Sequence, residues 1–145
     1  MNGKNILVDS EGIVWLIDFP FTGRGHVLQD LLKLENTLLF EYTLLAPSET
    51  ATAPGPEWPA ALAMARALCS SLELPAAPEL PGKLEFTWTA LQRLRQFAAR
   101  YTRKDPSLLQ FHVAALRYAL HTLSFRELPW QQKRWALASA IAHAV

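Results

Sequence analysis

The sequence has a single cysteine, Cys69, among its 145 residues. An intrachain disulfide and a zinc site built from several cysteines are therefore excluded. Cys69 lies among apolar residues, so we expect a small buried side chain in a reducing, cytoplasmic setting. No apolar run reaches the ~20 residues that a membrane span needs, and no signal-peptide pattern follows Met1. We therefore expect no membrane partner.

A strong net charge is also missing, because 14 Lys and Arg against 13 Asp and Glu give +1. The charge is unevenly placed: residues 1–83 carry 5 basic and 10 acidic side chains, and residues 84–145 carry 9 and 3. A basic half with tryptophans could indicate nucleic-acid binding. However, its arginines are spread around the predicted helices without exposed aromatic residues between them, so we expect no nucleic-acid partner.

Half of the residues are hydrophobic, which is enough for one domain with a core. The predicted fold class is α+β, mainly α, with a short N-terminal β-hairpin and about five helices. Proline-rich segments near 46–59 and 74–83 predict loops. The predicted domain spans residues 1–145, with a hairpin and following loop over 1–25 and a helical part over 26–145. Apolar spacing predicts helices over 26–45, 59–73, 85–102, 106–123 and from about 129 onwards.

The hairpin is predicted from two apolar runs, Ile6–Val8 and Ile13–Ile17, which flank Asp9-Ser10-Glu11-Gly12. With an even-numbered turn, Val8 pairs with Ile13, and Asn5 shares one face with Asp18 as a diagonal neighbour. Such neighbours lie roughly 7–8 Å apart or less. An amide oxygen and a carboxylate at that separation can share a magnesium ion. A turn of odd length would place one of the two on the opposite face.

The same residues also resemble a known family. Asn5-Ile6-Leu7-Val8 and Val14-Trp15-Leu16-Ile17-Asp18-Phe19 resemble the catalytic-loop and metal-loop segment of aminoglycoside phosphotransferases and the wider protein-kinase-like superfamily. The resemblance implies that Asn5 and Asp18 bind the magnesium ions on ATP. The family's catalytic Asp would fall one place before Met1, so no catalytic residue is assigned.

Asp30 matches, in its leucine-rich flank, an Asp that anchors the catalytic loop in that family. The resemblance therefore implies that Asp30 supports the loop, whereas the residues alone equally suit a solvated carboxylate near a helix N-terminus. His112 and His121 are nine residues apart without a companion carboxylate, so we expect no histidine metal site.

Two functions follow from this resemblance. The chain could be part of an ATP- and Mg²⁺-dependent phosphotransferase, similar to a kinase C-lobe without its N-lobe. We expect it to be inactive alone, because it has no Gly-rich phosphate loop and no strand lysine. The acceptor substrate is not indicated.

Alternatively, it is a catalytically dead interaction module, similar over Asn5–Glu35 to ternary-complex-associated domains of bacterial NTPase and conflict systems. Self-association, or a partner protein at the exposed lobe interface, would then be expected. A general helical binding domain is a third reading, in which the hairpin motif is a coincidence.

Overall fold

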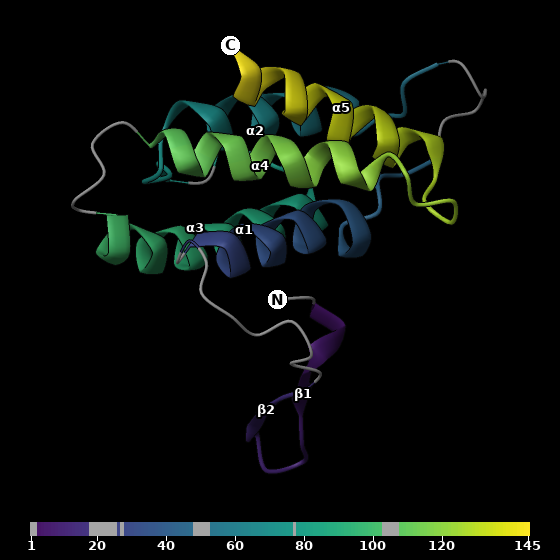
Figure 1. Ribbon diagram of the computed structural model, residues 1–145. Coiled ribbons are helices and arrows are strands. Elements are labelled where there is room, and N and C mark those ends of the chain that lie inside the picture. Colours follow the sequence, from purple (N-terminus) through teal and green to yellow (C-terminus); the bar gives the residue numbers. More distant parts are fainter. Residues whose placement is uncertain (1–2, 18–25, 27, 48–52, 77, 103–107) are drawn as a thin grey trace.

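The computed structural model describes residues 3–17, 26, 28–47, 53–76, 78–102 and 108–145 (Figure 1). A short 3₁₀ turn, η1 (Gly3–Asn5), leads into strands β1 (Ile6–Val8) and β2 (Val14–Leu16), which form a two-stranded antiparallel sheet. The helices are α1 (Leu28–Thr37), the π-helical turn η2 (Leu38–Tyr42), α2 (Trp58–Ser70), α3 (Gly82–Thr102), α4 (Leu109–Thr122) and α5 (Trp130–Ala144). The prediction of a mainly helical α+β fold is thus confirmed.

The helix predicted over 26–45 divides into α1 and η2. The chain leaves the helix at Thr43, whose backbone N–H and hydroxyl both donate to the Leu38 carbonyl, at 3.1 and 2.7 Å. Gln132 of α5 then holds this end: its amide donates to the Phe40 and Thr43 carbonyls, and its oxygen accepts from Leu45 N–H at 2.9 Å. Because Gln132 is fully buried, these bonds compensate its desolvation.

The other helices lie close to their predicted ranges. Helix α3 begins at Gly82, three residues earlier than predicted, because Pro81 precedes it and its carbonyl accepts from Leu84 N–H at 2.8 Å. Helix α4 begins at Leu109, inside its predicted range of 106–123. Helix boundaries are the part of a helix that sequence patterns place least accurately.

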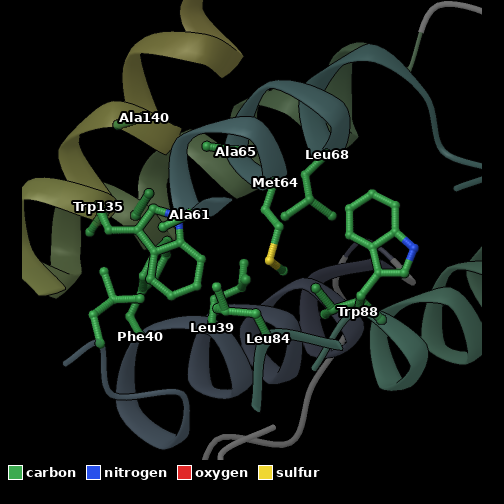
Figure 2. Packing of buried hydrophobic residues seen from close by; sticks show 14 residues of the cluster. Leu39, Phe40, Ala61, Met64, Ala65, Leu68, Leu84, Trp88, Trp135 and Ala140 are labelled. Atoms are coloured by element: carbon green, nitrogen blue, oxygen red, sulfur yellow. The ribbon is translucent and has the colours of Figure 1, made fainter. Parts of the chain in front are cut away.

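The helices pack in two layers, with α1 and α3 in one and α2, α4 and α5 in the other (Figure 1). The main core fills the space between them and contains two fully buried tryptophans, Trp88 and Trp135 (Figure 2). Phe40 contacts Trp135 edge-on with ring centroids 5.3 Å apart. A second cluster joins α1, α3 and α4 and consists of Leu28, Leu32, Leu72, Ala98 and Phe111.

The hairpin is separate from this helical body. In Figure 1 it extends below the α1–α3 layer instead of packing between helices. None of its residues belongs to either core cluster, and the side chains of its strands are mostly exposed. Among the described residues, no helix has the length and apolarity needed to cross a membrane.

Candidate functional site

The hairpin carries the predicted metal ligands, and its register differs from the predicted one. Ile6 pairs with Leu16 and Val8 pairs with Val14, instead of Val8 with Ile13. Asn5 therefore lies opposite Ile17, whose N–H donates to the Asn5 carbonyl at 2.9 Å. The even-numbered turn was wrong, and this register no longer places Asn5 and Asp18 on one face. Asp18 itself lies outside the described residues.

Asp9 and Gly12 determine this register. Asp9 and Ile13 close a three-residue loop, in which Asp9 N–H donates to the Ile13 carbonyl and Gly12 N–H to the Asp9 carbonyl. Gly12 has a φ of +80°, the left-handed conformation that follows a type I turn in three-residue hairpin loops. The odd loop length shifts every pair by one residue along β2.

The Asp9 carboxylate organises the turn further. It accepts hydrogen bonds from the Trp15 indole N–H at 2.8 Å, from Ile13 N–H at 2.9 Å and from Glu11 N–H at 3.0 Å. These bonds, with that from Trp15 the largest cause, lower the pKa of the Asp9 carboxyl group below its ordinary value. Asp9 therefore has a structural role in the loop.

Asp30 lies in the first turn of α1 and is exposed. The helix dipole favours a carboxylate at this position. The position also fits the loop-supporting role that the resemblance implies, so that role stays a prediction. In the described part of the chain, no three acidic, histidine or cysteine side chains form a metal-binding group. Magnesium binding by Asn5 and Asp18 stays a prediction too, and it now rests on the family resemblance alone, because the observed register removes the geometric argument for the pair.

The hairpin is apolar on both faces. The opposed pairs place Ile6, Val8, Val14 and Leu16 on one face, whereas Leu7 and Trp15 lie on the other. The large apolar side chains from Leu7 to Ile17 are 43–65% exposed. Strands that are apolar on both faces normally lie between two layers of protein.

The edges of the hairpin are also open. In an antiparallel pair, residues alternate between hydrogen-bonded and non-hydrogen-bonded pairs. The hydrogen bonds between the two strands join Asp9 to Ile13 and Asn5 to Ile17. The pair Val8 and Val14 therefore directs its backbone N–H and C=O groups away from the partner strand. An edge of this kind can pair with a strand of another chain.

A second polar cluster is buried in the helical body. The Arg95 guanidinium donates to both oxygens of the Glu35 carboxylate, at 2.6 and 2.9 Å. It also donates to the Leu68 and Ser71 carbonyls, each at 2.7 Å, which lie at the end of α2. The Phe111 ring lies 4.7 Å from the guanidinium carbon. This network joins α1, α2, α3 and α4 and satisfies most of the donors of Arg95.

Two histidines lie beside this ion pair. The Nδ1 atoms of His112 and His143 are 3.1 Å apart, and the ring centroids are 5.4 Å apart, so the two nitrogens face each other. Burial is the largest cause that lowers the pKa of His143, to about 4; the Glu35 carboxylate raises this pKa, and the nearby Arg95 lowers it further. Burial also lowers the pKa of His112. His143 is therefore neutral at pH 7, and a hydrogen bond between the two rings needs a proton on one of the two Nδ1 atoms.

Two cavities formed by described residues do not suit a nucleotide or a similar ligand. The first cavity has a volume of about 20 Å³, measured as the space open to the centre of a water molecule. It is lined by Glu35, Asn36, Ser139 and His143, among others. A larger open hollow of about 540 Å³ is lined by Pro78 to Pro81 and by Glu85, and its two carboxylates, Glu79 and Glu85, would repel phosphate. Within the described residues, the exposed hairpin is therefore the more distinctive surface.

Sequence reasoning missed the Glu35–Arg95 pair and the partner of His112. A signal existed for the ion pair, because Glu35 and Arg95 occupy buried positions of otherwise apolar helical stripes. His112 pairs with His143, which is 31 residues away, and not with His121. Cys69 is half-buried instead of buried, with its thiol donating to the Arg66 carbonyl.

Comparison with models of known protein families gives a match over most of the chain. The family model of ternary complex associated domain 9 matches residues 1–124, which include the hairpin and helices α1 to α4. A search of the curated proteins found no match, and neither did a search of the solved structures. The match covers most of the chain, so the chain belongs to the family of ternary complex associated domain 9.

Proposed function

We propose that this chain is a protein-association module and that its hairpin is the docking element. The single observation that carries this proposal is the exposure of a β-ribbon that is apolar on both faces and open at its edges. The family's description, ternary complex associated domain, supports association with partners. The low cysteine content favours the cytoplasm as the place where this happens.

Stability arguments support a partner at the hairpin. An isolated two-stranded hairpin is marginally stable in water, and a third strand or a packed face normally stabilises it. Each large apolar side chain that a partner covers contributes up to about 1.5–3 kcal/mol if it goes from fully exposed to buried. Side chains exposed by about half, such as Trp15 and Leu16, contribute correspondingly less each. Several together give enough free energy for specific binding.

The test uses matched positions on the two parts of the molecule. A photocrosslinking residue replaces Leu16 in the hairpin or Leu137 in α5, which are 43% and 44% exposed. We expect a protein, either another chain or a second copy, to crosslink from position 16 and not from position 137. The purified partner should then bind at least about tenfold more weakly to Leu16→Ser and equally well to Leu137→Ser. Equal crosslinking from both positions, or unchanged affinity of Leu16→Ser, would contradict the proposal.

A further variant tests whether the partner adds a strand. Val14→Pro removes an N–H that points away from β1, so the hairpin's own bonds are kept while that edge is blocked. Weaker partner binding by this variant, with the hairpin still formed, indicates strand addition at β2. Unchanged binding indicates that the partner contacts the faces alone.

A second candidate function is a magnesium–nucleotide half-site within a kinase-like C-lobe. The spacing of Asn5 and the Ile17-Asp18-Phe19 motif, which resembles that of aminoglycoside phosphotransferases, favours it. In this proposal Asn5 and Asp18 bind Mg²⁺ on ATP, Asp30 supports the loop, and an unknown acceptor completes the reaction in a fuller assembly. We expect no ATP turnover by the 145-residue chain alone. Fluorescent ATP that binds only with Mg²⁺, and not to Asp18→Asn, would support it; turnover by the isolated chain would contradict the expected inactivity.

A further inference from the structure

The outer face of α3 carries aromatic and basic side chains in one line. It consists of Phe86, Arg93, Phe97, Arg100 and Tyr101, which we call the α3 stripe. Phe86, Phe97 and Tyr101 are 76%, 46% and 53% exposed, and both arginines are exposed. At 100° per residue, the first four of these residues fall within an arc of about 60°. The structure therefore shows the interleaved pattern that the sequence did not reveal.

Folding does not account for this stripe. The opposite face of α3 supplies the core with Leu84, Trp88 and Leu91 and the buried network with Arg95, and all four are at most 1% exposed. Single exposed apolar residues are ordinary on protein surfaces, whereas three aromatic side chains on one helical line are not. Phe97 and Tyr101 contact each other edge-on, with centroids 5.2 Å apart, and leave their outer faces open.

The charges on the stripe have one sign. Neither Arg93 nor Arg100 forms an ion pair within the described part of the chain, and no carboxylate belongs to the stripe. Covering two arginines at an interface favours acidic partners, because an unpaired buried charge is costly. The stripe is therefore complementary to an apolar surface that carries carboxylates.

The spacing indicates a helical partner. Phe86, Arg93 and Arg100 recur every seven residues, and Phe97 lies four residues after Arg93, as in the contact seam of packed helices. Arg93 and Arg100 are separated by about 10.5 Å along the axis, which equals seven residues of a second helix. Two acidic residues seven apart on that helix would meet both arginines. Small or apolar residues between them would receive Phe86 and Phe97.

A nucleic acid fits the stripe less well. Affinity for a nucleic acid rises with the number of phosphates that basic side chains neutralise, and the stripe offers two arginines on a chain of net charge +1. We propose that the α3 stripe docks an amphipathic acidic helix of a partner protein. The α3 stripe shares no residue with the hairpin.

The probe for the test is a synthetic helical peptide of about three heptads. It has leucines along one seam and two glutamates seven residues apart beside that seam, and its matched control has lysines in place of the glutamates. We expect wild-type protein to bind the acidic peptide at least about tenfold more tightly than the lysine peptide. The double variant R93E and R100E should reverse that preference, because its two new carboxylates repel the acidic peptide and attract the lysine peptide.

Further variants and controls complete the test. Phe97→Ser should bind the acidic peptide at least about fivefold more weakly, whereas Ile141→Ser on α5, a similarly exposed apolar position, should bind it normally. Circular dichroism and thermal unfolding confirm that each variant is folded. Leu16→Ser in the hairpin should also bind the peptide normally. Failure of docking at the hairpin and failure of peptide binding at the α3 stripe can therefore be told apart. Equal binding of both peptides, or tighter binding of a single-stranded oligonucleotide or an anionic vesicle, would overturn the proposal.

Discussion

The hairpin and the helical body differ in how completely they bury their large apolar side chains. Trp88 and Trp135 are fully buried in the helical body, whereas Trp15 in the hairpin is 55% exposed and donates to the Asp9 carboxylate. The helical body thus buries two of its four tryptophans completely, although Trp130 at the start of α5 is 60% exposed, whereas the strands of the hairpin leave their apolar side chains exposed on both faces. From this difference we expect the stability of the chain to reside in the helices, and the docking surface proposed for the hairpin to lie on a separately folding unit.

The largest expected effect is a core tryptophan replacement. Trp135→Ala should lower the free energy of unfolding by about 3–5 kcal/mol, because it leaves a cavity and removes the contact with Phe40. Trp15→Ala should change the global free energy of unfolding by less than about 1 kcal/mol. Denaturant titration followed by circular dichroism measures both. Similar losses for the two variants would show that the hairpin belongs to the same cooperative unit as the helices.

The buried ion pair should give the next effect. Arg95→Met leaves the Glu35 carboxylate and two carbonyls of the α2 end without donors, so we expect a loss of about 3–4 kcal/mol. The double variant Arg95→Met with Glu35→Leu should lose less than Arg95→Met alone, because no buried charge is then left unpaired. Arg93→Met on the exposed face of the same helix is the matched control and should change the free energy little. An equal loss for Arg93→Met would contradict the structure.

The histidine pair predicts a pH dependence for the helical body. The folded-state pKa of His143, about 4, lies below the ordinary 6.5, so the unfolded chain binds more protons between these values. Stability from this group is therefore complete above pH 6.5 and falls as the pH decreases towards 4, by up to about 3 kcal/mol. Denaturant titrations at several pH values should show this fall in the wild type and much less of it in His143→Leu. His121→Asn, at an exposed position of α4, should keep the wild-type dependence.

Much of the fold could be predicted from the sequence, because the helical body obeys simple periodicity. Apolar residues at three- and four-residue spacing indicated each of its helices, and prolines indicated the loops. The division of the first helix could not be foreseen, because Gln132, about ninety residues away, accepts from and donates to the backbone where η2 ends. Contacts of that sequence separation are invisible to a local pattern.

The candidate site was less predictable, for two physical reasons. The hairpin loop can have three or four residues with the same sequence, and the choice depends on Asp9, whose carboxylate bonds to Trp15 six residues away. An Asp at the first position of a turn with Gly three residues later is the available signal for the type I turn found here. The exposed α3 stripe, in turn, becomes apparent only when the buried face of the same helix is known.

The smallest expected effect is the sharpest test of the hairpin as a separate unit. Gly12 has a φ of +80°, and a Cβ there would meet no atom within 4 Å, so Gly12→Ala costs only backbone strain, about 1 kcal/mol. The matched control is Gly82→Ala at the start of α3, where a Cβ is equally free of contacts and φ is not positive. If the hairpin folds independently, hydrogen exchange at Ile13 and Ile17 should quicken about fivefold in Gly12→Ala, while thermal unfolding of the helices stays unchanged. Gly82→Ala should leave hairpin exchange unaltered, since its change lies within the helical body. A lower unfolding temperature of the helices in Gly12→Ala would instead mean that the hairpin and the helices unfold together, and that recognition and stability are not divided between them.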